Sequence, residues 1–169
     1  MIYNSELTQE RLQEVAHYDI HSGIFTARRG RARRKEGEEL GTIRQDGYRA
    51  IMVDGKWYRA HRLAWLYVYG EFPDTSLDHA NRDKLDNRIL NLRPATDSQN
   101  NINKGLRKNN TTGATGIYPV SRQKGTGYTT YIYKDGKKTS LGTFDTPEEA
   151  QSVRLKAAND LYGEFAEIA

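Results

Sequence analysis

The spacing of apolar residues changes several times along the first 70 positions, and each change marks a predicted element. Helical spacing predicts a short helix over residues 8–17. Alternating apolar and polar residues then predict hairpins over residues 18–29 and 41–60. Helical spacing returns over residues 61–69, and Gly70 is placed to end that helix.

The C-terminal part shows strand-like alternation followed by a helix. We expect strands over residues 116–120, 128–134 and 138–141. Thr146 is suited to cap the following helix, and Pro147 takes its first position. The apolar residues of this helix lie along one face: Ala150, Val153, Ala157 and Leu161. The helix would cover one side of a three-stranded antiparallel sheet and leave the other side bare, so the chain is expected to be an α+β protein.

The stretch between these two parts, residues 77–101, is too polar to form a core. It places a carboxylate and an imidazole side by side, Asp78 and His79. It also contains two carboxamides, Asn91 and Asn100. An alternative interpretation is a solvated loop rich in Asx turns.

Local signals permit these side chains to face one another. His79 stands at an expected strand end. Thr96 and Gln99 have the spacing of a capping box, which would begin a helix at residue 97 and place Asn100 in its first turn.

These residue types suit phosphodiester hydrolysis, which needs a base for water and a cation for the developing negative charge. His79 can be the base, because imidazole titrates near neutral pH. Asp78 and Asn100 offer the oxygen ligands that a hard ion such as Mg²⁺ prefers, with the phosphate completing the shell.

The composition narrows the function classes. The chain lacks cysteine, which excludes disulfides and cysteine zinc sites. His17 and His21 are interpreted as structural rather than as a metal site. Nothing resembles a signal peptide or a membrane span, so we expect a cytoplasmic protein without a membrane partner.

The net charge is +4, and the positive charge is concentrated in two short stretches. Such clusters are what binding to a polyanion requires. Alternatively, the arginine run is a solvated loop balanced by Glu36, Glu38 and Glu39. The first cluster comprises Arg28, Arg29, Arg31, Arg33, Arg34 and Lys35, and the second, in a polar linker over residues 102–110, comprises Lys104, Arg107 and Lys108.

The run DHANRDKLDNRILNL…SQNN resembles the HNH endonuclease motif, a ββα-metal finger, in the branch found in phage homing endonucleases. The preceding HRLAWLYVYGEFP is similar to the segment that leads into the motif. The resemblance implies that His79 is the general base, that Asn91 orients it, and that Asn100 takes the third position, where many members have histidine. It also implies that Asp78 and Asn100 hold one Mg²⁺ or Mn²⁺ ion. Arg62 is either a phosphate contact or part of a structural salt bridge.

The segments TGATGIY, YTTYIYKDGKKTSLGTFDTPEEAQSVRLKAA and YGEFA resemble the APETALA2-type DNA-binding domain. That family commonly has arginines and a tryptophan on its strands, whereas this chain has Tyr128, Thr129 and Tyr131. Affinity would then depend more on the basic linker and the arginine run. An alternative is a protein-interaction domain. The resemblance implies these groove-facing positions: Tyr118, Arg122, Thr129, Tyr131, Tyr133, Lys138 and Ser140.

The expected protein is therefore an HNH nuclease module over residues 1–101, a basic linker over 102–110 and a sheet-based DNA reader over 111–169. It would nick double-stranded DNA as a monomer, as a homing endonuclease in the cytoplasm of a phage-infected bacterium, without a small-molecule cofactor. The alternatives are a catalytically silent, sequence-specific DNA-binding regulator and a protein-interaction protein.

Overall fold

The chain folds into two compact units, each with its own core. The computed structural model describes residues 7–30, 35–102, 110, 112–134 and 136–166. The first unit is Met1–Pro94 and the second is Ala95–Ala169. This division falls ahead of the predicted module end at residue 101. Most of the predicted linker lies outside the described residues, so the predicted module boundaries stay predictions.

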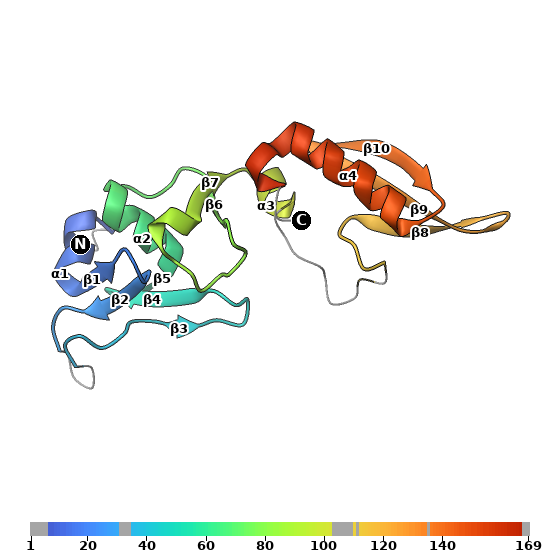
Figure 1. The fold of residues 1–169 in the computed structure, drawn as a ribbon. Helices are drawn as coiled ribbons and strands as arrows, with labels where there is room; N and C mark the ends of the chain where they lie inside the picture. The colour runs from blue at the N-terminus through green and yellow to red at the C-terminus, as the bar shows by residue number, and fades with distance from the viewer. Residues whose placement is uncertain (1–6, 31–34, 103–109, 111, 135, 167–169) are drawn as a thin grey trace. The chain divides into compact units, whose positions relative to one another are not determined.

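The first unit combines short helices with small sheets (Figure 1). Strands β1 and β2 pair, β3, β4 and β5 form a three-stranded sheet, and β6 pairs with β7. The elements in chain order are α1 (Gln9–Val15), β1 (Ala16–Asp19), β2 (Ile24–Ala27), β3 (Thr42–Ile43), β4 (Arg49–Val53), β5 (Lys56–Arg59), α2 (Ala60–Tyr69), β6 (Ser76–His79), the 3₁₀ helix η1 (Ile89–Asn91) and β7 (Leu92–Ala95).

Local signals set the boundaries of these elements. The Oγ1 atom of Thr8 accepts a hydrogen bond from the backbone nitrogen of Arg11 at 3.2 Å and so caps α1. Asp54 and Gly55 have φ angles of 47° and 81°, as a type I′ turn between β4 and β5 requires. Gly70 ends α2 in the left-handed region, at φ 87°. The predicted helices and hairpins of this unit are present, but the first helix ends at Val15, and Ala16 and His17, which were predicted to be helical, belong to β1. Strand β3 adds a strand to the second hairpin.

The core of the first unit gathers side chains from α1 and α2 and from strands of all three of its sheets. Leu12, Phe25, Ile51 and Leu63 are among its largest fully buried side chains. Burying a side chain of this kind contributes about 1.5–3 kcal/mol. Asn87 is a polar residue with the same degree of burial, which requires hydrogen-bond partners for its amide.

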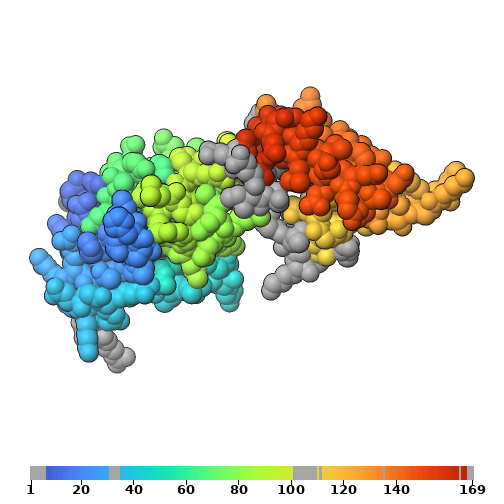
Figure 2. Space-filling view, viewed as in Figure 1, coloured from blue at the N-terminus to red at the C-terminus, as the bar shows by residue number. Residues whose placement is uncertain are grey.

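The second unit consists mainly of a three-stranded antiparallel sheet and a long helix. Helix α4 runs along one face of the sheet (Figure 1), as the sequence predicted. The β8–β9 hairpin projects past the end of that helix (Figure 2). The elements of the second unit are α3 (Asp97–Ile102), β8 (Ile117–Arg122), β9 (Gly125–Lys134), β10 (Lys137–Phe144), α4 (Pro147–Tyr162) and the 3₁₀ helix η2 (Gly163–Phe165).

The start of α4 is as predicted. Thr146 and Glu149 make a reciprocal capping box, and Pro147 follows the cap. The buried face differs from the prediction, however, because Val153 and Leu161 are 37% and 38% exposed.

The buried line of α4 instead runs through Ala150, Arg154 and Ala158. A Cβ atom on Gly116 would lie 2.3 Å from Nε of Arg154, so the glycine leaves the space that the guanidinium occupies. An arginine stem can cover apolar surface, which explains how this side chain takes a core position. Among the described helices, none combines the length and the hydropathy that crossing a bilayer requires.

Candidate functional site

Asp78 and His79 end strand β6, where the sequence predicted a strand end. Both are buried, with 7% and 4% of their surface exposed. The backbone nitrogen of Ala80 donates to the carbonyl oxygen of Asn91 at 2.9 Å, which closes the loop that follows His79. The carboxylate and the imidazole therefore stand on a paired strand rather than on a free loop.

The imidazole of His79 has a buried amide partner, Asn87. Nε2 of His79 lies 3.3 Å from Oδ1 of Asn87, while Nδ2 of Asn87 donates to the carbonyl oxygen of Leu85 at 3.0 Å. Because the amide turns its NH₂ group to that carbonyl, its oxygen faces the ring. This contact is a hydrogen bond in the tautomer that carries its hydrogen on Nε2, and in that tautomer Nδ1 is the basic nitrogen.

Burial favours the uncharged form of this ring. It lowers the pKa of His79 below its ordinary value, against the opposing effects of the Asn87 hydrogen bond and of the nearby carboxylates, first among them Asp78. His79 is therefore neutral at neutral pH. A neutral imidazole is the form that can accept a proton.

The side chain of Asn91 binds the backbone at two points of the loop that follows His79. Its Oδ1 accepts from the backbone nitrogen of Asn81 at 3.0 Å, and its Nδ2 donates to the carbonyl oxygen of Asp86 at 2.8 Å. That Asn91 orients His79 stays a prediction. These hydrogen bonds could produce that effect by fixing the backbone of the loop that follows His79.

The carboxylate of Asp78 makes an ion pair with the partly buried Arg93. Nε of Arg93 donates to Oδ2 of Asp78 at 3.0 Å. Across the part of the chain that the structure describes, no group of three or more His, Asp or Glu side chains is placed to hold a metal ion. Asp78 nevertheless fits as the single acidic ligand of a hard ion that takes its other oxygens from an amide, water and phosphate.

Asn100 lies in α3, in the second unit. The predicted capping box is confirmed, because the backbone nitrogen of Gln99 donates to Oγ1 of Thr96 at 3.3 Å and that of Thr96 donates to Oε1 of Gln99 at 2.7 Å. The helix thus begins where the sequence predicted. The role of Asn100 as a metal ligand with Asp78 stays a prediction.

The predicted basic contacts of the first unit are only partly available. Arg28 donates to the carbonyl oxygen of Ala16 at 3.3 Å, and Arg62 donates to that of Pro73 at 3.3 Å, so both also have a structural role. Arg29 and Lys35 are exposed. The other predicted basic contacts lie outside the described residues: Arg31, Arg33, Arg34, Lys104, Arg107 and Lys108.

The sheet of the second unit has the predicted alternation. Thr130 and Ile132 are buried towards α4, whereas Tyr133 is 47% exposed and Tyr131 is half-buried. The register also brings the predicted groove-facing residues together: Tyr118 pairs with Thr129, Tyr131 with Ser140, and Tyr133 with Lys138.

Aromatic rings dominate this uncovered face. Tyr118 and Tyr131 stack with their centroids 5.1 Å apart and an interplanar angle of 3°. Nζ of Lys138 lies 3.6 Å from the Tyr131 centroid. Arg122 forms an ion pair with Asp145 at 2.5 Å, so its charge is already balanced.

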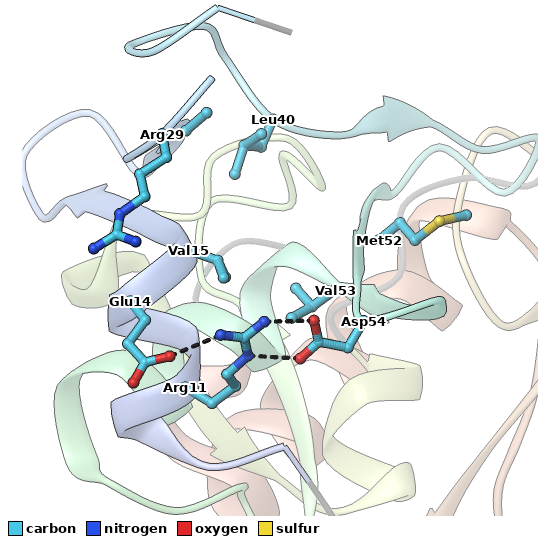
Figure 3. Close-up of a pocket in the computed structure, with 9 residues that line it drawn as sticks. Arg11, Glu14, Val15, Arg29, Leu40, Met52, Val53 and Asp54 are labelled. Carbon is cyan, nitrogen blue, oxygen red and sulfur yellow. Dashed lines mark hydrogen bonds and ion pairs between the residues drawn. The ribbon is translucent and has the colours of Figure 1, made fainter. Parts of the chain in front are cut away.

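A pocket of about 390 Å³ lies in the first unit, and it contains none of the predicted catalytic residues. Arg11 occupies its wall, where it donates to both carboxylate oxygens of Asp54 at 2.8 Å and to Glu14 at 2.7 Å (Figure 3). Arg29, one of the predicted basic contacts, also lines this pocket.

Sequence reasoning missed Asn87 as a site residue. It stands between Asp86 and Arg88 in a loop rich in turn formers, where an asparagine is expected to make a turn. It lies inside the run that resembles the HNH motif, but neither its residue type nor its spacing from Asn91 indicates which ring it contacts.

Comparison with known proteins relates this geometry to a family. Residues 58–102 match the model of the HNH endonuclease family, and that segment contains Asp78, His79 and Asn87. An uncharacterized HNH endonuclease of Acanthamoeba polyphaga mimivirus is 32% identical over 124 residues, which are 72% of this chain. The chain spans 62% of the length of that relative. No solved structure gives a significant match. Residues 58–102 of this chain are therefore similar to the HNH endonuclease domain.

Proposed function

We propose that this protein is a DNA endonuclease in which His79 is the general base for phosphodiester hydrolysis. The observation that carries the proposal is the buried imidazole of His79, whose Nε2 faces the amide oxygen of Asn87, beside the carboxylate of Asp78 in the segment that matches the HNH family. The mimivirus relative bears the name of an HNH endonuclease, which agrees with this function.

In this mechanism, Nδ1 of His79 takes a proton from a water molecule as the water oxygen attacks phosphorus. The bond from phosphorus to the 3′ oxygen breaks as the new bond forms. Asn87 holds the ring, and Asn91 holds the loop behind it. Ordered partners of this kind keep a base within reach of its proton, which is a large part of enzymatic rate enhancement.

The resemblance to the HNH motif assigns Asp78 and Asn100 as ligands of one divalent ion, and we retain that assignment. When bound, Mg²⁺ or Mn²⁺ supplies positive charge to the transition state and to the leaving oxygen. Arg93 holds one oxygen of Asp78 and so fixes the orientation of this carboxylate.

Double-stranded DNA is the proposed substrate, and the second unit is proposed to bind it. Its uncovered face presents Tyr118, Tyr131, Tyr133 and Lys138 on a ribbon of the size that enters a major groove. The resemblance to APETALA2-type domains supports this placement. A monomer with a single hydrolytic site would cut one strand, as expected of a nicking homing endonuclease of phage type.

The test is cleavage of supercoiled plasmid, after the target has been identified by sequencing the cut ends of a random-insert plasmid library. We expect nicking in Mg²⁺ or Mn²⁺ that a chelator stops. His79→Ala should lower the rate about 10²- to 10⁴-fold, the range for loss of a general base, and should leave DNA affinity unchanged.

The matched control is His21→Ala, which removes an exposed histidine from the β1–β2 turn and should retain the wild-type rate. Binding of DNA without cleavage in either metal would contradict the nuclease proposal and identify a catalytically silent DNA-binding regulator. The absence of salt-sensitive DNA binding would contradict both.

A further inference from the structure

Two further rings, those of Tyr48 and His61, pack against the imidazole of His79. The centroids of His61 and His79 are 5.1 Å apart, and the ring planes meet at 87°. Tyr48 lies 5.8 Å from His79 and 5.2 Å from His61. Each ring therefore contacts the other two, at separations where tilted and edge-to-face aromatic pairs are favourable.

The ring of Tyr48 is itself held in place. The backbone nitrogen of Tyr48 donates to Oδ1 of Asp46 at 3.3 Å, and the carboxylate of Asp46 also accepts from the guanidinium of Arg59. The Arg59 guanidinium carbon lies 5.2 Å from the centroid of the Tyr48 ring, and Nζ of Lys84 lies 4.8 Å from it. Such cation–π contacts favour one ring position.

Lys84 connects this arrangement to the loop after His79. Its Nζ donates to the carbonyl oxygen of Asp46 at 2.9 Å. Residues 80–88, which include Lys84, follow His79 directly and contain its partner Asn87. The segment that carries Tyr48 is thus bonded to the loop that supports the base.

His61 contributes its ring surface rather than a hydrogen bond from Nδ1. Only 8% of the residue is exposed, and its buried Nδ1 has no hydrogen-bond partner among the described residues. Burial lowers the pKa of His61 to about 3, so the ring is uncharged at neutral pH. A buried nitrogen without a partner costs free energy. Stability alone would therefore favour a phenyl ring at this position.

We propose that Tyr48 and His61 are positioning residues that fix the ring plane of His79 for proton transfer. This inference rests on the proposed nuclease function. Tyr48 lies outside the segment that matches the HNH family, so the upstream hairpin of this chain supplies part of the support for the base. Neither residue is proposed to touch the phosphate.

The experiment compares ring removal with ring retention at both positions. His61→Ala and Tyr48→Ala should lower kcat about 10- to 100-fold, because small misplacements of reacting groups cost up to about 10² in rate. KM should stay within about twofold, since neither residue is among the proposed DNA contacts. His61→Phe and Tyr48→Phe keep an aromatic ring at each position and should keep kcat within about threefold of wild type.

A second readout does not need DNA or metal. Long-range ¹H–¹⁵N NMR of the free protein should show one set of His79 ring signals with hydrogen on Nε2 in the wild type and in both Phe variants. The Ala variants should give broadened or multiple sets. Thermal unfolding of each variant confirms that it is folded, and His61→Phe should unfold at a higher temperature than wild type.

Tyr69→Ala is the matched control, because it removes an exposed ring that pairs with Trp65 away from His79. It should leave kcat and the His79 signals unchanged. Wild-type kcat in both Ala variants would overturn the inference, as would an equal loss in the Phe and Ala variants. A wild-type protein that cuts no DNA would refute the proposed function instead, and the NMR comparison would still decide whether Tyr48 and His61 order the ring of His79.

Discussion

Replacing Asn87 with alanine tests whether a neighbouring amide sets the tautomer of the proposed base. The substitution removes the oxygen that lies 3.3 Å from Nε2 of His79. The carbonyl of Leu85 loses one donor but keeps the bond from the backbone nitrogen of residue 87 at 3.1 Å. The uncompensated loss therefore falls on the ring of His79, which is 4% exposed.

The magnitude follows from the cost of leaving a buried polar group without its partner, about 1–3 kcal/mol. We expect the free energy of unfolding of Asn87→Ala to fall by that amount, plus a contribution from the space the side chain leaves. The same interaction energy no longer favours the tautomer with hydrogen on Nε2. At about 1.4 kcal/mol for each factor of ten, kcat should fall about 5- to 150-fold.

Three measurements check this reasoning: single-turnover nicking, chemical denaturation, and the His79 tautomer by ¹H–¹⁵N NMR. DNA affinity should stay at the wild-type value, because Asn87 is buried. Asn159→Ala, which makes the same chemical change at an exposed position of α4, should change none of the three. An Asn87→Ala protein that keeps both the wild-type kcat and the Nε2-protonated ring would refute the argument.

Three other substitutions test separate parts of the structure. Asp78→Asn should abolish cleavage and remove the rise in melting temperature that Mg²⁺ or Mn²⁺ gives the wild type. It should also destabilise the metal-free protein by about 1–3 kcal/mol, because the partly buried Arg93 loses the negative charge of its partner Asp78; an unchanged metal response would contradict the ligand assignment. The pKa of His61 is about 3 in the folded protein and about 6.5 in the unfolded chain. As the pH falls below about 6.5, His61 is therefore protonated in the unfolded chain but not in the folded protein. The free energy of unfolding should therefore fall by about 3 kcal/mol by about pH 4 because His61 is buried uncharged. Chemical denaturation of His61→Phe should show no such fall, and a free energy of unfolding with the same pH dependence as the wild type would contradict this prediction. Gly116→Ala should cost more stability than Gly113→Ala in thermal melts, because both sites have positive φ but only the first would place a Cβ against Arg154; equal losses would show that the guanidinium moves aside freely.

Local sequence signals predicted most elements correctly, because each depends on neighbours a few residues apart. Thr96 with Gln99 and Thr146 with Glu149 are capping boxes in the sequence and in the structure. The alternation along β9 gave the correct faces of the C-terminal sheet. Asp78 and His79 were placed correctly at a strand end for the same reason.

The sequence alone determined which side chains carry the candidate chemistry and which backbone signals begin and end the elements around them. Only the tertiary structure decided what surrounds the base: Asn87 on its Nε2, with Tyr48 and His61 against its ring. It also decided that Arg154, rather than Val153, packs under the sheet. The physical reason is range, since periodicity and capping are properties of adjacent residues, whereas the contacts of a buried ring depend on segments that are distant in the chain and meet only when the core forms.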